Sequence, residues 1–349
     1  MTPEVTIDIA SSGNSSLVSQ RLLQSGFDPG VLRPFEHEGH NLVTNRKNET
    51  MVTNAPALLR KDEWEQLDTA VVNGARNRLK LISDLRSSGL TYDITAGIGK
   101  TTLVTQKASE ITAAEVSMHP TTQAGSDNQQ FDTDTLPLPV VSKDFSIPIR
   151  LLESSRLDGT PLDIAQAEQC GRRVAEMIEQ IGCGKVAPSY GGNTVYGVTN
   201  FPSRNTQTLD DPTQSGWTPA VTVQDVLQMK NTSQLDGHYG PWKLYNGAGW
   251  DVYLDDDYSD AKGDNTLRQR ILSIDGIQSI DTLDYLGQYE MVLVQQTSDV
   301  IRLVDVVDVT TVQWETMGGL MLHMKVMAVL VPQVRAEYEG KCGVVHGNI

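Results

Sequence analysis

Residues 142–180, SKDFSIPIRLLESSRLDGTPLDIAQAEQCGRRVAEMIEQ, contain the strongest secondary-structure signals of the chain. Apolar and polar residues alternate from Phe145 to Leu151, which predicts a β-strand. Pro148 lies within this pattern and lacks a backbone N–H, so it indicates the edge of a sheet or a bulge.

The same segment then predicts a long helix. Thr160 can cap it, Pro161 suits its first position, and Asp163 is favourable in its first turn. Apolar residues follow at helical spacing up to the glycines at 182 and 184: Ala167, Cys170, Val174, Met177, Ile178 and Ile181. At 1.5 Å per residue, such a helix is roughly 30 Å long.

Upstream, residues 58–86 predict one amphipathic helix, with Gly89 as its stop. Its apolar stripe consists of Trp64, Leu67, Val71, Ala75, Leu79, Ile82 and Leu85. Residues 1–57 are polar, contain three prolines and show no periodic apolar face. They predict an irregular, extended arm rather than a domain.

Between the two helices, residues 91–142 are rich in Thr, Ser and Gln. Strand-like pieces at 101–106 and 136–141 flank a polar middle, HPTTQAGSDNQQ. About fifty residues are too many for an ordinary surface loop, so we expect a long two-stranded excursion. Such a hairpin buries little of its own surface and is stable only when it lies on something else.

Downstream, residues 186–320 predict a mixed region with a short helix near 223–229 and strands at 290–296 and 300–312. Residues 320–331 are almost continuously apolar, which predicts a buried central strand. We expect this strand to return to the first core, because it follows Gly318-Gly319 and closes the chain.

Composition excludes several classes of protein. The 349 residues are 39% apolar and 21% charged, as in ordinary globular proteins. No apolar run approaches the ~20 residues that span a bilayer, and we see no signal peptide, so we expect synthesis in the cytoplasm and no membrane partner. A net charge of −16 argues against a protein that grips phosphates, although a local basic lining stays open.

Motifs for redox, zinc or phosphate chemistry are missing from the sequence. Cys170, Cys183 and Cys342 have no CxxC spacing, which argues against a disulfide framework or a zinc ribbon. The segment GIGKT at 97–101 has Ile94 where a phosphate loop needs glycine, and it precedes no predicted helix. We interpret it as a chance match.

An acidic run could suggest a calcium loop: Asp255, Asp256, Asp257, Asp260 and Asp264. The sixth loop position holds an aspartate instead of glycine, and no glutamate closes the loop. The six histidines form no HExxH pair, and no GxSxG elbow occurs. We therefore predict no catalytic, cofactor-binding or metal-binding residues and no enzymatic activity.

Four blocks resemble major capsid proteins of tailed double-stranded DNA phages with the Hong Kong 97-like fold. They are residues 61–94 (KDEWEQLDTAVVNGARNRLKLISDLRSSGLTYDI), residues 142–180, residues 196–209 (YGVTNFPSRNTQTL) and residues 290–334. The segment 142–180 also has the general form found in encapsulin nanocompartment shells. The resemblance covers about residues 58–349 and rests on the order of the blocks.

The resemblance implies an α+β fold with an N-terminal arm, an extended β-hairpin loop, a peripheral domain with a long spine helix, and an axial domain. By position, the arm is 1–57, the first peripheral helix 58–90, and the extended loop 91–142. The peripheral strand and spine helix are then 143–185, the axial domain 186–317, and the C-terminal peripheral strands 318–349.

It further implies self-assembly of hexamers and pentamers into an icosahedral shell that encloses phage DNA without reading its sequence. The protein would reside in the virion. Portal and decoration proteins are possible partners. The arm is short and shows no coiled-coil heptads, so we expect scaffolding to be a separate protein or to be absent. Some family members crosslink a loop lysine to a neighbour's asparagine; Lys100 and Lys107 lie in the matching segment.

Two alternatives stay open. One is an encapsulin-like compartment that holds a cargo enzyme and shares the fold. The other is a soluble metal-dependent hydrolase with an acidic site in residues 251–264, also a place where a divalent ion could bind at a subunit contact.

Overall fold

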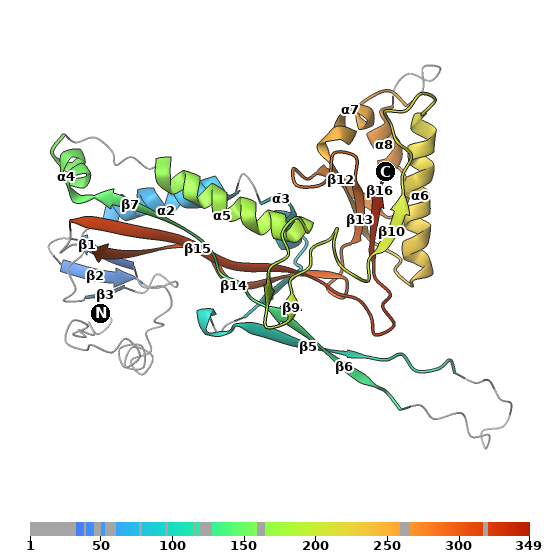
Figure 1. Ribbon diagram of the computed structural model, residues 1–349, viewed down its shortest axis with the longest axis horizontal. Helices are drawn as coiled ribbons and strands as arrows, with labels where there is room; N and C mark the ends of the chain where they lie inside the picture. The colour runs from blue at the N-terminus through green and yellow to red at the C-terminus, as the bar shows by residue number, and fades with distance from the viewer. Residues whose placement is uncertain are drawn as a thin grey trace.

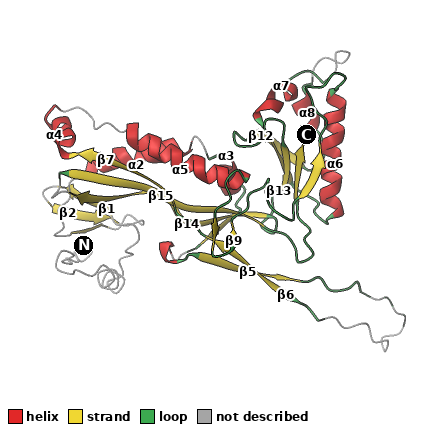
Figure 2. Cartoon of the chain, viewed as in Figure 1, coloured by secondary structure: helices red, strands yellow, loops and turns green. Residues whose placement is uncertain are grey.

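The computed structural model describes residues 33–37, 40–44, 50–52, 61–76, 79–94, 97–114, 116, 118, 128–158, 165–258, 265–316 and 320–349. The chain is a mixed α+β protein with two packed bodies and one projecting hairpin (Figures 1 and 2). We call the bodies the long-sheet body and the five-stranded body. Within the expected arm, β1 (Arg33–His37), β2 (His40–Thr44) and β3 (Thr50–Val52) form an antiparallel sheet, so that part is not irregular.

The long-sheet body is built on a four-stranded sheet in the order β4-β14-β15-β7. Its strands are β4 (Thr91–Asp93), β7 (Val141–Pro148), β14 (Ile301–Thr316) and β15 (Met321–Val334). The antiparallel β14–β15 ladder runs from Ile301↔Val334 to Thr316↔Met321. The prediction of a buried central strand near the C-terminus is confirmed by β15. Pro148 ends the edge strand β7, as predicted.

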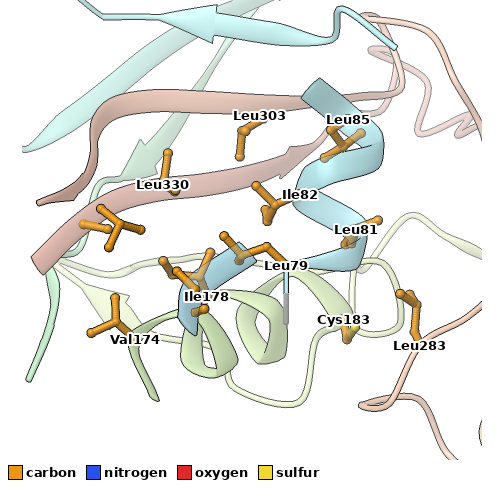
Figure 3. Packing of buried hydrophobic residues seen from close by; sticks show 14 of the residues in the cluster. Leu79, Leu81, Ile82, Leu85, Val174, Ile178, Cys183, Leu283, Leu303 and Leu330 are labelled. Atoms are coloured by element: carbon orange, nitrogen blue, oxygen red, sulfur yellow. The ribbon is translucent and has the colours of Figure 1, made fainter. Parts of the chain in front are cut away.

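Three helices cover one face of this sheet: α2 (Lys61–Arg76), α3 (Lys80–Ser87) and α5 (Ala165–Cys183). Leu79, Ile82, Val174 and Ile178 from the helices and Leu330 from β15 point into one core (Figure 3). The core is continuous across helices and sheet, so the helices are held by apolar burial rather than by local propensity alone.

Two glycines set the distance between α2 and α5. A Cβ on Gly171 would collide with the backbone carbonyl of Val71, and a Cβ on Gly74 would collide with the carbonyl of Glu168. Because neither position has room for a side chain, the two helix backbones pack directly against each other.

The predicted single helix over 58–86 is wrong in one respect: it is broken in two. Leu79 has φ −89° and ψ 73°, which is not helical, and α3 starts after it. The break rotates the second helix so that Leu81 is buried as well as Ile82. The predicted stop at Gly89 is confirmed, since this residue has φ +70° and its N–H donates to the Arg86 carbonyl at 3.0 Å.

The strand predicted up to Leu151 ends at Pro148, and α4 (Ile149–Asp158) follows. The reason is that its partner β15 begins at Met321, so the sheet offers no further ladder. The last link is the Ile149 N–H, which donates to the Leu320 carbonyl at 3.0 Å. The predicted start signals at 160, 161 and 163 lie outside the described residues.

The five-stranded body has the strand order β10-β16-β13-β11-β12. Its strands are β10 (Asn205–Thr208), β11 (Trp242–Asn246), β12 (Ile277–Thr282), β13 (Met291–Gln295) and β16 (Val344–Asn348). Three helices pack on one face: α6 (Pro219–Leu235), α7 (Asp251–Leu254) and α8 (Leu267–Leu272). The helix predicted at 223–229 is longer in the structure. Pro219 occupies its first turn, and polar residues extend it past Met229 to Leu235.

Sheet membership differs from the expected division at residue 317. Strand β14, expected in the axial domain, pairs in the long sheet, and β16, expected in the peripheral domain, pairs in the five-stranded sheet. That division therefore separates β14 from its hairpin partner β15. Apolar runs do not reveal which sheet a strand joins, because either core buries them equally well.

We predict that Gly171→Ala lowers the free energy of unfolding by about 1–3 kcal/mol, because forcing a methyl group between packed backbones costs more than the gain in helix propensity. Gly99→Ala is the control, since a Cβ there meets no heavy atom within 4 Å and its change should be below about 0.5 kcal/mol. Urea unfolding of both variants measures the difference. Equal stability of the two would show that α2 and α5 are not in backbone contact.

Candidate assembly surfaces

The hairpin of β5 (Thr102–Ala108) and β6 (Phe131–Pro137) projects from the base of the long sheet (Figure 1). Its strands pair from Thr102↔Pro137 to Ala108↔Phe131. The cross-strand pair Leu103 and Leu136, near the base, is buried. Farther out, Val104 is 57% exposed and Phe131 66% exposed. The hairpin thus presents apolar side chains that this chain does not cover.

Beyond the paired strands, Ile111, Val116 and Met118 are also exposed. Residues 108–133 contain four carboxylates and no Lys or Arg. An isolated two-stranded hairpin is only marginally stable in water, and contiguous exposed apolar groups mark interaction sites. The distal hairpin is therefore an acidic, apolar surface suited to a partner.

Polar contacts link the two strands of the hairpin to each other and link the hairpin to the segment around Tyr338. Lys107 pairs with Asp134 at 2.9 Å, and the Tyr338 hydroxyl donates to Gln130 Oε1 at 2.9 Å. A groove of about 570 Å³ separates the Gln106–Ile111 limb from residues 335–338. Exposed contacts of this kind contribute about 1 kcal/mol or less each, so they orient the hairpin without locking it.

The two lysines expected as crosslinking candidates lie in different settings. Lys107 is ion-paired within the hairpin, whereas Lys100 follows the short 3₁₀ turn Gly97–Gly99 and is half-buried. This turn leads into strand β5 rather than a helix, so the GIGKT segment has no helix N-terminus to hold a phosphate.

Helix α3 contacts the five-stranded body through charged groups, beside an apolar cluster that the two bodies share through Tyr245, Leu283 and Val292. Asp84 on α3 contacts Lys243 Nζ at 2.7 Å and accepts a hydrogen bond from the Tyr245 hydroxyl at 3.3 Å. Lys243 also pairs with Asp281 at 3.1 Å. Burial is the main cause that raises the pKa of Tyr245, so this phenol stays protonated. The junction is a partly buried network whose members need one another, because an unpaired charge left there is costly.

Glu179 on α5 caps the start of α3. Its Oε1 accepts a hydrogen bond from the Leu81 N–H at 2.7 Å, and Leu79 supplies no side-chain cap of its own. Glu179 is buried, and its Oε2 has no hydrogen-bond partner in the described part of the chain. Burial raises the pKa of Glu179 from 4.5 to about 7, with a smaller increase from Asp84. The Glu179 carboxyl group accepts a hydrogen bond from an otherwise unpaired N–H at the start of α3, while its burial disfavours the ionised form.

The acidic run of 255–264 is partly described. Asp255 accepts from Arg268 Nε at 2.8 Å, and Arg268 also contacts Asp251 at 3.1 Å. Asp260 and Asp264 lie outside the described residues. No cluster of three or more His, Cys, Asp or Glu in the described ranges could hold a metal ion. Of the described carboxylates in this run, Asp255 is thus ion-paired with Arg268, and Asp256 accepts a hydrogen bond from the Asp257 N–H at 2.9 Å.

The histidines and cysteines are dispersed among the described residues. His346 lies between Arg204 Nε at 3.3 Å and Glu290 at 3.8 Å, and burial lowers its pKa. All three cysteines are buried and free, and burial raises the pKa of each thiol. A buried protonated thiol is a poor nucleophile. No helix in the described part of the chain is both long and apolar enough to cross a membrane.

Sequence reasoning missed Glu179 and the α3 junction. A signal for Glu179 existed, because it lies four residues after Ala175 and so falls on the buried stripe of α5. The Asp84–Lys243 pair joins residues far apart in the chain, and no local pattern indicates such a contact.

Comparison with known families and proteins gives one family match. A family model described as "Family of unknown function (DUF6260)" matches residues 54–347. No curated protein matches the sequence.

Several solved structures share the fold. The chain is similar to a virus-like particle from Pyrococcus furiosus, with a TM-score of 0.60 and 15% identity over 82% of this chain and 99% of that one. It is similar to the capsid of Myoviridae phage XM1, with a TM-score of 0.56 and 9% identity over 72% of this chain and 88% of that one. It is also similar to a chain of Mycobacterium phage Adephagia, with a TM-score of 0.56 and 12% identity. That match covers 76% of this chain and 90% of the other. The predicted Hong Kong 97-like fold is confirmed.

Glu179→Gln should stabilise the protein at pH 8 by about 1–3 kcal/mol and leave it nearly unchanged at pH 5. The folded pKa, about 7, exceeds the ordinary value of 4.5, so the folded state binds this proton more tightly. The stability due to Glu179 is thus fully present below pH 4.5 and is lost as the pH rises through about 7. Urea unfolding from pH 5 to pH 8 measures the effect.

Glu179→Ala is the contrasting variant, because it removes the acceptor and leaves the α3 N–H unpaired. It should destabilise the protein at both pH values. A parallel pH dependence of the wild type and Glu179→Gln would contradict the raised pKa.

Proposed function

Because the chain belongs to the DUF6260 family of unknown function and has the fold of phage capsid subunits, we propose that it is a major capsid protein. It assembles as hexamers and pentamers into an icosahedral shell and resides in the virion. Its role is structural rather than catalytic. Separate scaffolding, portal and decoration proteins are its expected partners.

The proposal gives each part of the chain a role. The arm, residues 1–57, runs along neighbouring subunits, and the extended loop within 91–142 lies on an adjacent copy. The long-sheet body is the peripheral domain with α5 as its spine. The five-stranded body is the axial domain, and sheet membership supports adding β16 to it and moving β14 to the peripheral domain.

The observation that carries the proposal is the uncovered hairpin. Ile111, Val116 and Met118 of the distal hairpin are exposed and belong to no core of their own chain, although burying such side chains contributes about 1.5–3 kcal/mol each. A neighbouring copy provides that burial. Repeated at several contacts per subunit, modest interfaces produce a strong shell.

The charge of the chain fits enclosure of DNA rather than recognition of it. A subunit of net charge −16 repels phosphates, so DNA has to be driven in by work from outside the shell.

A second candidate is a compartment that holds a cargo protein. It is supported by the similarity to the Pyrococcus furiosus virus-like particle, of which the match covers 99%. The two candidates differ in content: nuclease-protected DNA inside particles from infected cells supports the capsid, and a stoichiometric co-purifying protein supports the compartment.

The first test is negative-stain microscopy of the full-length protein after size exclusion. Closed particles or rings of five and six subunits are expected. The shell function would be contradicted if the protein stayed monomeric at all concentrations, both alone and when co-expressed with the other structural proteins of its source.

Replacing residues 109–130 by Asn-Gly should give a folded subunit that forms no stable closed particles. Asn-Gly joins the last cross-strand pair, Ala108 and Phe131, by a tight turn and removes only the distal hairpin. Thermal unfolding should match that of the full-length subunit, since no described core residue is lost. Particle yield is measured by sedimentation and microscopy. Shells like those of the full-length chain would contradict the role of the loop.

A further inference from the structure

Helix α6 carries apolar side chains on two opposite sides. Val223, Val226 and Met229 face the core of the five-stranded body. On the other side, Leu227 is 45% exposed and Leu235 77% exposed. Figure 1 shows α6 as the outermost element of this body. The outer side of α6 thus presents two leucines that no other part of the described chain covers.

The outer side of α6 also lacks charge. Its exposed positions are Ala220, Gln224, Leu227, Gln228, Asn231 and Leu235. The two charged residues of the helix point elsewhere: Asp225 is buried, and Lys230 donates to the Asp275 carbonyl at 2.6 Å. The exposed face is therefore made of amides and leucines.

This neutral face contrasts with the rest of the body. Residues 186–300 contain fifteen Asp or Glu and six Lys or Arg, a net charge of −9. Two such bodies repel each other when they approach within about 8 Å, the screening length at physiological salt. The repulsion is least where one of the two surfaces is uncharged, which selects the α6 face for a close contact between copies.

The opposite side of the body provides a complementary surface. Helix α8 packs between α6 and α7, so α7 lies away from the α6 face (Figure 1). On α7, Val252 is 76% exposed, and Asp255, Asp256 and Asp257 follow directly. The Gln and Asn amides of α6 can donate hydrogen bonds to these carboxylates, and Leu235 offers apolar surface to Val252.

We propose that the outer face of α6 in one copy packs against the α7 side of the next copy, head to tail. The inference rests on the proposed shell function and names the contact within its rings. A head-to-tail contact uses two different surfaces of each copy, and it closes into a ring when the rotation between successive copies is five-fold or six-fold. It joins a neutral face to an acidic one, whereas two α7 sides would place acid against acid.

Thiol labelling tests the contact directly. The native cysteines are buried, so Leu235→Cys and Val252→Cys each introduce one exposed thiol, and the unsubstituted protein gives the background. Each variant is labelled in intact particles and in subunits released from them. We expect both thiols to react at least about tenfold more slowly in particles, because a covered group reacts only on local opening. A thiol at either position that reacts equally fast in both states overturns the contact.

Charge substitution provides a second, independent readout. Leu235→Glu places a carboxylate in the neutral face and should reduce the yield of rings and particles at least about tenfold, with unchanged thermal unfolding of the subunit. Gln278→Glu adds the same charge at an exposed position of β12 and is the matched control. Normal assembly of Leu235→Glu overturns the contact. If the unsubstituted chain forms no ring or particle, that result contradicts the proposed shell function and, with it, the proposed contact.

Discussion

The antiparallel ladder of β14 and β15 is the constraint on which the remaining structure depends. Alternate residues of β15, Leu322, Met324 and Val326, are buried beneath the helices, while His323 and Lys325 lie on the opposite face. A slip of one residue would carry Lys325 into the core and the apolar set out of it, so the register is fixed by burial. On the open face, His323 stacks on Trp314 with ring centres 5.4 Å apart, which supports the same register.

The ladder also positions the two bodies. Five residues separate the end of β13 from the start of β14, and β15 leads to β16, so both long strands are connected at one end to the five-stranded sheet. Apolar packing continues from the long-sheet body into the second body through Tyr245 and Val292, and α3 adds the Asp84–Lys243 ion pair. Charged contacts have stricter geometry than apolar ones, and they weaken when a member is protonated or hydrated. The junction between the bodies therefore combines one shared apolar cluster with a group of partly buried ion pairs.

Sequence patterns predicted the parts of the fold whose residues interact locally. The stripe of α5, except for the exposed Met177, the stop at Gly89 and the edge position of Pro148 follow from spacing and backbone chemistry. The break at Leu79 and the sheet membership of β16 do not, because they are determined by tertiary partners: the burial of Leu81 and the pairing with β10 and β13. Among the candidate surfaces, the loop was predictable from its length and polarity, whereas the neutral face of α6 required knowing which side is buried.

Two features of the chain are locally inconsistent with a free monomer, and they share a cause. The hairpin exposes a group of apolar side chains that includes Phe131, and α6 exposes Leu227 and Leu235; grouped exposed apolar side chains mark interaction sites. Both lie at the periphery, beyond the two cores, and both stand in an acidic chain. Acidity keeps free subunits apart and soluble, so only surfaces that combine apolar area with low charge can bring copies together. The net negative charge therefore opposes non-specific association and restricts contact between copies to a few orientations. Because each subunit of a shell makes several contacts, a defined orientation matters more than high affinity at any single contact.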